Sequence, residues 1–539
     1  MLRALRKSTT HRYGRPGSSL SITCRGKKRG EELFAYTNGH FLTNEEHQLS
    51  RRYVRFDVDE LCNTTAAVGG NSSQVTAIDK MEGGFSKVFL MKKENGSEVI
   101  AKIPCHIAGP PTLTTAGEVG ALEYIRKHTS IPVPRSSNNS NAVGAEYIIM
   151  EKAASVPLYQ VWGAMAEFDQ LQLIRNLTQI EAQLSAIHFP AYGGLYLRTD
   201  IEQPNKPLND DPSFCIGPSC DRGYNPDPSL DFDKGPWYSI STLGVSLAKR
   251  ELLRISKNGQ QDQALQQNQA VFYKGDIKEQ TEILQATESV MELLDSNEIL
   301  NGEASQPTLW HTDLHMGNIF VAPNELSLID LQSISVLPAF LQAQWPVFLK
   351  PPQNYDYEMG IFEVKLRDDF DTLDEDSKML AMREWSQVKL AKAYEISTLL
   401  EDKPAHKAMN VPRVFRELFL RCGEVSEIGV LPLRACLIEL FQNWSDLGFS
   451  GECPLSFTQE QIDKHEHQFS EYQAWYKIQA LAQECLDTDA EGWVAPGLDV
   501  NEKRTQNEEL LTMYIESVGG EKSADEARAT WPFPIKAGV

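Results

Sequence analysis

The sequence predicts an α+β protein in which a small lobe with an antiparallel sheet is followed by a larger, mainly helical lobe. Two observations carry this prediction. Between residues 75 and 154, short apolar runs are separated by turn signals and interrupted by one helical pattern. From Leu171 onward, apolar residues recur mostly at helical spacing. We therefore expect a first lobe at 75–154, a helical second lobe at 155–400, and a further helical region at 401–539 packed on the second lobe.

The first lobe should contain a small five-stranded sheet and one helix. Its first two expected strands flank Glu82-Gly83-Gly84, and the third follows Asn95-Gly96, a strong hairpin signal. The helix begins at a threonine that could act as its cap. The sequence segments expected to form these elements are Val75–Met81, Phe85–Met91, Val99–Ile103 and Glu146–Met150 as strands and Thr114–His128 as the helix.

The segments around the lobes are less regular. Residues 31–74 should form an N-terminal extension, in which Asn63–Ser73 is small and polar and favours a linker. In the second lobe, Leu171–His188 is expected to be helical. The interval 200–235 is rich in Pro, Asp and Asn and should form a long loop.

Composition excludes several classes of protein. The 539 residues carry a formal charge of −22, and an acidic chain repels phosphate backbones, so nucleic acid is not an expected partner. No stretch approaches the ~20 unbroken apolar residues of a membrane helix, so we expect no transmembrane segment. The nine cysteines lack paired spacing, which is typical of reduced thiols in an intracellular compartment.

The N-terminus has the composition of a targeting segment. Residues 1–30 carry nine Lys or Arg and no Asp or Glu, and they are rich in Ser and Thr. This pattern predicts a mitochondrial transit peptide, with the mitochondrial import machinery as partner and a mitochondrial location. The alternative is a disordered basic tail.

The strongest chemical pattern is LWHTDLHMGNIFVAPNELSLIDLQ at residues 309–332. Asp313 and Asn318 lie in a loop, and a hairpin of Ile319–Ala322 and Leu326–Ile329 then leads to Asp330. Because a hairpin returns to its starting edge, Asn318 and Asp330 should lie side by side. Mg²⁺ prefers oxygen ligands and takes one or two protein side chains plus substrate phosphates. We therefore expect Asn318 and Asp330 to bind Mg²⁺ and Asp313 to act as the base for an attacking hydroxyl.

This His-x-Asp-x-x-x-x-Asn pattern with its hairpin and following Asp resembles the catalytic and metal loops of kinase-like phosphotransferases. The His-x-Asp start and the Ile-Asp-Leu-Gln ending resemble the aminoglycoside and choline phosphotransferase branch, because protein kinases have Phe-Gly after the metal Asp. The resemblance implies a bilobal protein-kinase-like fold, ATP and Mg²⁺ as cofactors, and transfer of the γ-phosphoryl group to a hydroxyl of an unidentified, small-molecule acceptor.

The resemblance also implies roles upstream. Lys102, on the third strand, matches the lysine that contacts the α- and β-phosphates, and Glu118 matches its glutamate partner. The turn at 82–88 occupies the phosphate-loop position, although it has two adjacent glycines and a bulky Phe rather than Gly-x-Gly-x-x-Gly. The expected site residues are Asp313 and His311 as the catalytic pair, with His311 holding the loop through hydrogen bonds; Gly83, Gly84, Phe85, Ser86, Lys102, Glu118 and, at the hinge, Glu151 as nucleotide-binding residues; and Asn318 and Asp330 as metal ligands.

A closer resemblance extends along nearly the whole chain. Segments FAYTNGHF, EGGFSKVFL, SEVIAKIP, SIPVPR, FCIGPS, GPW, HTDLHMGNIFV and EGWV are similar to the fungal group of altered inheritance of mitochondria protein 9. That group is regarded as mitochondrial and carries an aminoglycoside-phosphotransferase-type domain. The resemblance supports the transit peptide and implies no particular substrate.

Other interpretations remain open at this point. Asp313 could cap a backbone turn, Glu123 could replace Glu118 as the partner of Lys102, and His311 with His315 could bind a catalytic zinc. Aromatic residues of the C-terminal helices could form a substrate cage, although at helical spacing they favour a core. A catalytically silent, ATP-binding pseudokinase that acts as a scaffold is the alternative function, because fold does not imply function. The C-terminal aromatic residues concerned are Phe441, Trp444, Phe469, Tyr472, Trp475 and Tyr476.

Overall fold

Alternation of apolar and polar residues builds the first lobe. In the computed structural model, β3 (Val75–Glu82), β4 (Ser86–Lys93) and β5 (Glu98–Pro104) are consecutive antiparallel strands. Along β4, buried and partly exposed side chains alternate, because successive side chains of a strand point to opposite faces. The β4–β5 turn is at Gly96, whose φ of +82° favours glycine. The residues that the structure describes are 20–23, 30–68, 72–134, 136–137, 142–202, 206–224, 230–261, 274–322, 325–352, 358–520 and 522–535.

The sheet has six strands in the order β1-β3-β4-β5-β7-β6, so the expectation of five was wrong by one. The strand β7 (Ile148–Glu151) pairs with β5, and β6 (Ser136–Ser137) adds a short outer edge. At the opposite edge, β1 (Leu20–Thr23) pairs with β3. This strand falls inside the segment expected to be a transit peptide; residues 1–19 and 24–29 lie outside the described residues.

One helix, α5 (Leu113–His128), joins the two lobes. Its Val119 packs with β7 in a small cluster, while Ala121, Leu122, Tyr124 and Ile125 belong to the core of the second lobe. Gly120 allows this close packing, because a Cβ there would lie 2.4 Å from the carbonyl oxygen of Leu195. The predicted threonine cap was wrong: Thr112 is the N-cap without a side-chain hydrogen bond, and the Thr114 hydroxyl bonds to the carbonyl of Pro110.

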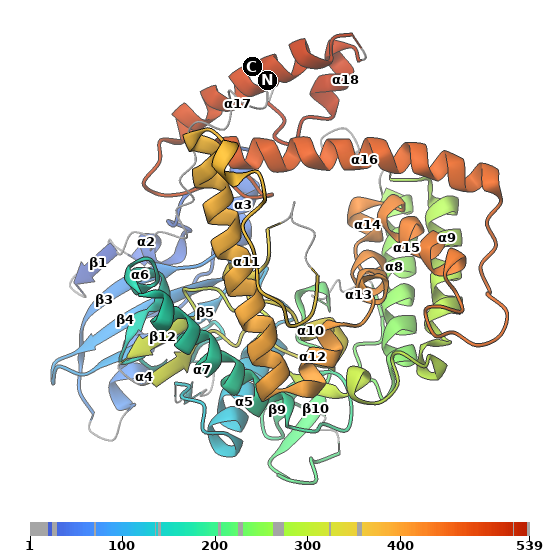
Figure 1. Cartoon of the computed structure of the whole chain (residues 1–539). Coiled ribbons are helices and arrows are strands. Elements are labelled where there is room, and N and C mark those ends of the chain that lie inside the picture. Colours follow the sequence, from blue (N-terminus) through green and yellow to red (C-terminus); the bar gives the residue numbers. More distant parts are fainter. Residues whose placement is uncertain are drawn as a thin grey trace.

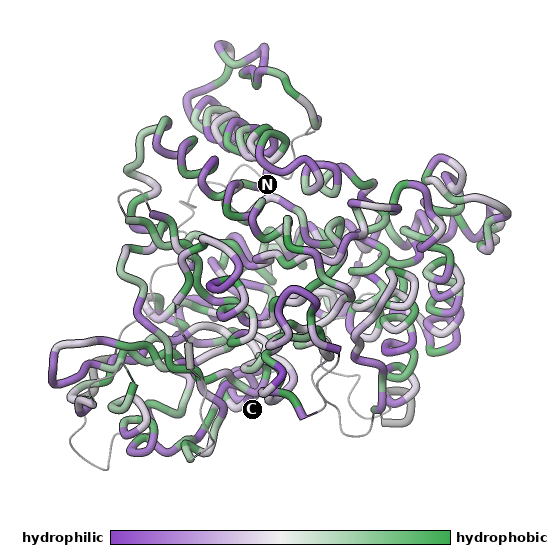
Figure 2. Tube along the Cα trace, turned by 90° about the horizontal axis from the view of Figure 1, so that it is seen from below, coloured by the Kyte–Doolittle hydropathy of each residue, from purple (hydrophilic) through white to green (hydrophobic). Residues whose placement is uncertain are grey.

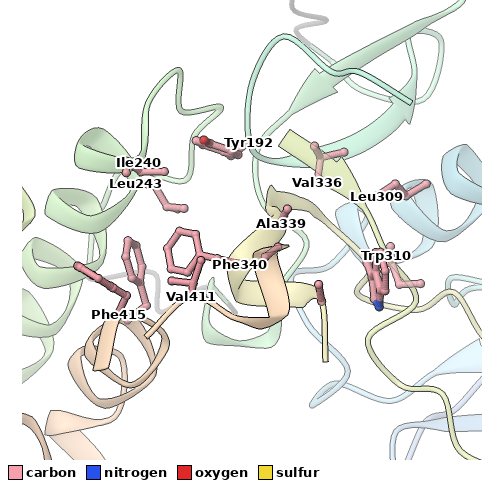
Figure 3. Packing of buried hydrophobic residues seen from close by; sticks show 14 of the residues in the cluster. Tyr192, Ile240, Leu243, Leu309, Trp310, Val336, Ala339, Phe340, Val411 and Phe415 are labelled. Atoms are coloured by element: carbon pink, nitrogen blue, oxygen red, sulfur yellow. The ribbon is translucent and has the colours of Figure 1, made fainter. Parts of the chain in front are cut away.

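The second lobe is mainly helical (Figure 1). Figure 3 shows that Leu309, Val336 and Phe340 point into one core with Ile240, Leu243 and Phe415. The catalytic-loop segment therefore begins directly at the hydrophobic core. The helices are α6 (Leu158–Val161), α7 (Glu167–Ser185), α8 (Ile240–Gln261), α9 (Ile277–Met291), α10 (Ala339–Gln342), α11 (Glu375–Glu401), α12 (Lys403–Met409), α13 (Arg413–Cys422), α14 (Val425–Ile428) and α15 (Leu431–Gln442).

Short strands and 3₁₀ turns connect these helices. Most pair locally, and β12 also pairs with β8, so the hairpin of the candidate site is anchored to the segment that follows the sheet. The short strands are β8 (Val156–Pro157), β9 (Gly194–Leu197), β10 (Phe214–Gly217), β11 (Pro307–Leu309), β12 (Ile319–Ala322), β13 (Glu325–Leu328) and β14 (Val336–Pro338). The 3₁₀ turns are η2 (Trp162–Ala164), η3 (Arg222–Tyr224), η4 (Leu294–Ser296), η5 (Gly302–Ser305), η6 (Val347–Leu349) and η7 (Phe370–Thr372).

The N-terminal extension contacts the C-terminal region. The N-terminal strand β2 (His40–Phe41) pairs with β15 (Trp493–Val494), and the indole of Trp493 donates to the carbonyl of Asn38 at 2.7 Å. The long helix α16 crosses the molecule between the helical lobe and this contact, with α17 and α18 beyond it (Figure 1). The elements of these two regions are α2 (Gly30–Phe34), α3 (Glu45–Arg51), α4 (Val58–Ala67), α16 (Gln459–Leu486), α17 (Val500–Val518) and α18 (Ala524–Ala529).

Several expected boundaries need correction. Asn63–Ala67 is not a linker, because it forms the second half of α4, which Asp57 caps through the Glu60 amide. The interval 200–235 is not wholly a loop, since it contains β10 and η3. Figure 2 shows hydrophilic and hydrophobic residues alternating along the helices, as expected for helices with one buried face. Among the described helices, none is long and apolar enough to cross a membrane.

Candidate active site

The site centres on one lysine that joins three elements. Lys102 lies on β5 between two fully buried residues, and its ammonium group is 2.7 Å from Glu118 Oε1 of α5. The same ammonium group is 2.6 Å from Asp330 Oδ1, which follows β13 in the second lobe. The structure thus brings together three residues that the sequence analysis singled out. Glu123, the alternative partner, instead forms an ion pair with Arg126 at the surface.

Burial and charge act against each other in this triad. Burial lowers the pKa of Lys102, but attraction to Asp330 and Glu118 outweighs it and raises the pKa. Burial likewise raises the pKa of Asp330, and the charge of Lys102 reverses this effect, so the pKa ends below its ordinary value. For Glu118, burial dominates and the pKa is raised despite Lys102. Lys102 and Asp330 therefore stabilise each other in their charged forms.

The loop that carries Asp313 is held by a buried histidine. His311 donates from Nε2 to the carbonyl of Ile329 at 2.9 Å, and its Nδ1 accepts the amide N–H of Asp313 at 3.3 Å. These two contacts require a neutral ring, and burial lowers the pKa of His311 accordingly. His311 thus ties the loop to the end of the hairpin and acts as a positioning residue.

The carboxylate of Asp313 is exposed, and it makes no hydrogen bond within the described parts of the chain. It is the backbone carbonyl of Asp313 that bonds, accepting from the amide of His315 and from the side chain of Asn318. The interpretation of Asp313 as a capping carboxylate was therefore wrong. An open carboxylate in a loop fixed by His311 and Asn318 is suited to accept a proton.

Asn318 and Asp330 fit a small cation with oxygen ligands. The amide nitrogen of Asn318 donates to the carbonyl of Asp313 at 3.0 Å, which leaves its Oδ1 as the free acceptor. The amide of Ile329 donates to the carbonyl of Asn318 at 3.0 Å, so the hairpin places Asp330 next to Asn318, as its geometry predicts. Asp330 has a φ of +62°, an unfavourable conformation for a residue with a side chain and one that is found at functional sites. The described residues contain no cluster of three or more His, Cys, Asp or Glu arranged to bind a metal, the zinc site of the alternative interpretation included.

The glycine turn closes the site from the first lobe. Gly83 donates to the carbonyl of Ser86 at 3.0 Å, and the hydroxyl of Ser86 donates to Gln332 Oε1 at 3.0 Å. The space above Gly84 is open, because no atom lies within 4 Å of a Cβ placed there. Arg52 of the N-terminal extension fixes the turn from behind by donating to the carbonyl of Gly84 at 3.1 Å. Apart from its chain neighbours, no described side chain therefore fills the space next to the α-carbon of Gly84.

Glu151 ends β7 with its backbone paired to Val99 and its side chain exposed, and its role at the nucleotide hinge stays a prediction. Arg222 was missed. It lies on η3 with its guanidinium carbon 3.4 Å from the centroid of the Phe85 ring. No local signal could have found it, because η3 and the glycine turn are far apart in sequence.

The C-terminal aromatic residues mostly pack against each other. Trp444 is buried and stacks on Phe449, and Phe469 stacks on Tyr472. Trp475 donates to the carbonyl of Thr530, while Tyr476 is exposed. Only Trp444 of the six therefore lies in the buried core that their spacing favours.

Comparison with known proteins agrees with this geometry. Residues 78–340, which contain the lysine, the glutamate, the catalytic loop and the hairpin, match the family described as Phosphotransferase enzyme family. This segment is a phosphotransferase-family domain. The domain spans both the sheet and the helical lobe, which meet where Lys102 of β5 contacts Asp330.

Full-length relatives are fungal. The chain is 28% identical to a subtelomeric hrmA-associated cluster protein of Aspergillus fumigatus, over 84% of this chain and 95% of the relative. It is 22% identical to altered inheritance of mitochondria protein 9, mitochondrial, of Yarrowia lipolytica, over 82% of each chain. Among solved structures, the streptomycin–ATP–APH(2″)-IIa ternary complex matches at 14% identity with a TM-score of 0.35, covering 74% of this chain and all of that one.

Proposed function

We propose that this protein transfers the γ-phosphoryl group of ATP to a hydroxyl group of a small-molecule acceptor. One observation carries the proposal: Lys102 of the first lobe reaches Asp330 of the second lobe in the same site as the open carboxylate of Asp313 and the free Oδ1 of Asn318. A lysine, a metal pair and a base on opposite sides of one cleft are the parts that phosphoryl transfer requires.

Each residue has a defined task in this reaction. Lys102, oriented by Glu118, binds the nucleotide phosphates. Asn318 and Asp330 would hold a magnesium ion, which would neutralise phosphate charge. Asp313 orients the acceptor hydroxyl and takes its proton while the oxygen bonds to the γ-phosphorus and the bond to ADP breaks. His311 keeps Asp313 in place through the backbone.

Binding of Mg-ATP tests the nucleotide site. Saturating ligand at about 100 times its dissociation constant should stabilise the folded protein by ~2.7 kcal/mol, which is measured as a rise in the unfolding temperature. The rise should require Mg²⁺ and disappear in Asp330→Ala. A chain that binds no Mg-ATP at millimolar concentration would refute the proposal.

The role of Asp313 is tested separately. A panel of hydroxyl-bearing amines, sugars and cholines is screened for acceptor-dependent ADP release. With an acceptor in hand, Asp313→Asn should lower turnover by about 10²- to 10⁴-fold and leave Mg-ATP binding unchanged. Unchanged turnover in this variant would exclude Asp313 as the base, and rescue of a null strain by it would favour the scaffold instead.

We further propose that the protein acts in mitochondria. The basic, acid-free residues 1–30 and the mitochondrial name of the Yarrowia lipolytica relative support this. Two truncations separate targeting from folding, because β1 pairs with the sheet: one lacks residues 2–19 and the other residues 2–30. Both should remain outside mitochondria in cells, and import of either truncated chain would contradict the proposal.

A further inference from the structure

Arg222 sits over the glycine turn without an ionic partner. Its guanidinium lies against the ring of Phe85, the bulky residue of that turn. The side chain is exposed, and within the described ranges it forms neither a hydrogen bond nor an ion pair. Stacking therefore holds the guanidinium plane while its N–H donors remain available.

The charges around Arg222 are those of the proposed active site. Burial of its surroundings lowers the pKa of Arg222, and this effect is opposed by the carboxylates of Asp313, Asp221 and Asp330. Asp313 and Asp330 are thus within electrostatic range of the guanidinium without bonding to it. The guanidinium therefore lies against the glycine turn and in the field of the two carboxylates that the proposed function assigns to the base and the metal ligand.

The backbone that carries Arg222 is fixed. Asp221 accepts from the amide of Gly223 at 2.8 Å, and the carbonyl of Gly223 accepts from Arg254. Tyr224 is buried under the guanidinium of Arg250, whose carbon lies 4.6 Å from the ring centroid. On the other side, the thiol of Cys220 contacts the carbonyl of Ile334, just past the metal loop. Arg222 therefore projects from a rigid turn, which limits the entropy lost when it binds a ligand.

We propose that Arg222 binds the terminal phosphate of the nucleoside triphosphate, with Phe85 as the platform that orients its guanidinium. A planar guanidinium presents parallel N–H groups that match two phosphate oxygens. Phe85 thereby has a function that a third glycine could not supply. This inference rests on the proposed function, because it needs the nucleotide to occupy the cleft.

Binding of ATP and ADP distinguishes the terminal phosphate from the rest of the nucleotide. Mg-ATP and Mg-ADP are titrated calorimetrically into the full chain and into Arg222→Gln, Arg222→Lys and Arg528→Gln. Arg528 is a matched control, since it is an exposed arginine on α18 whose ion pair within the described residues is with Asp525. Arg222→Gln should weaken Mg-ATP by about 10- to 100-fold, the range of a hydrogen bond to a charged group, and Mg-ADP by less than about 3-fold. Arg222→Lys should fall between, because it keeps the charge and loses the planar fork.

The outcomes separate the inference from the function on which it rests. If the unaltered chain binds Mg-ATP and Arg222→Gln lowers ATP and ADP affinity equally, or raises ATP affinity, the inference is wrong and the proposed function stands. If the unaltered chain binds no Mg-ATP, both fail. Unfolding temperatures without ligand, equal for all four chains, show that any loss of binding is not loss of folding.

Discussion

Two clusters of buried lysine and carboxylate lie on the same sheet, and they differ in how completely they are closed. Behind the glycine turn, Lys80, Lys87 and Glu82 have side chains that are at most 2% exposed. In the cleft, Lys102 and Glu118 are similarly buried, but the side chain of Asp330 is 40% exposed. The first cluster comes from β3 and β4 alone, whereas the second draws on both lobes.

The closed cluster satisfies its charges within the protein. Lys80 donates to the carbonyls of Glu32 and Ala35, and Glu82 also accepts from the amide of Thr37 at 2.8 Å. The N-terminal extension thus covers these charges and fixes the base of the glycine turn. In the second cluster, the ammonium group of Lys102 remains paired with the carboxylate of Glu118 even if Asp330 moves away. The same residue types therefore stabilise a fold where every charge is enclosed, and they can serve binding where one partner faces solvent.

The largest expected loss of stability follows from a substitution in the closed cluster of Lys80, Lys87 and Glu82. Glu82→Ala leaves two buried ammonium groups without a carboxylate, which should cost about 3–5 kcal/mol of unfolding free energy. Chemical denaturation of the variant measures this. Glu98→Ala at the edge of β5, where Glu98 pairs with the exposed Lys152, is the control and should change stability by less than about 1 kcal/mol. Equal effects of the two substitutions would remove the distinction between the clusters.

A third buried carboxylate, that of Glu181, has no cation beside it among the described residues and so differs from both clusters. Glu181 of α7 accepts from the hydroxyl of Tyr394 at 2.8 Å, and burial raises its pKa to about 8. The folded state then holds a proton that the unfolded state releases above about pH 4.5, so stability falls as pH rises from about 5 to 8. At about 1.4 kcal/mol per pKa unit, the loss amounts to a few kcal/mol.

Glu181→Gln should remove this dependence, because the amide keeps an acceptor for Tyr394 and carries no charge. Its unfolding temperature should exceed that of the unaltered chain at pH 8 and match it near pH 5. A variant less stable than the unaltered chain at pH 8 would show that the carboxylate is ionised and compensated.

The smallest expected effect on stability is in the cleft. Asp330→Asn removes one partner of Lys102, but Glu118 remains and the lost carboxylate is partly solvated. Unfolding free energy should therefore change by less than about 1 kcal/mol. Chemical denaturation without ligand measures this, and a loss similar to that of Glu82→Ala would show that the cleft cluster is structural.

Local patterns were enough to predict much of the site. The hairpin that places Asn318 beside Asp330 follows from alternation and turn chemistry, which act between near neighbours. The choice of Glu118 over Glu123 came from the family resemblance, and the structure confirms that Glu118 pairs with Lys102. The small polar segment after Cys62 was wrongly predicted to be a linker. It belongs to α4, which packs against the sheet, and this tertiary contact overrides the weak local propensity.

The sequence by itself determined the order of β3, β4, β5, α5 and β7, the motif at residues 309–332 and the residues at its centre, because periodicity, turns and short spacings act over a few residues. Only the tertiary structure decided that Arg52 bonds to the carbonyl of Gly84 and Trp493 to that of Asn38. It also decided that Lys102 bonds Asp330 across the lobes and that Arg222 stacks on Phe85. These contacts join residues far apart in the chain, and only packing of the whole core fixes which distant side chains meet.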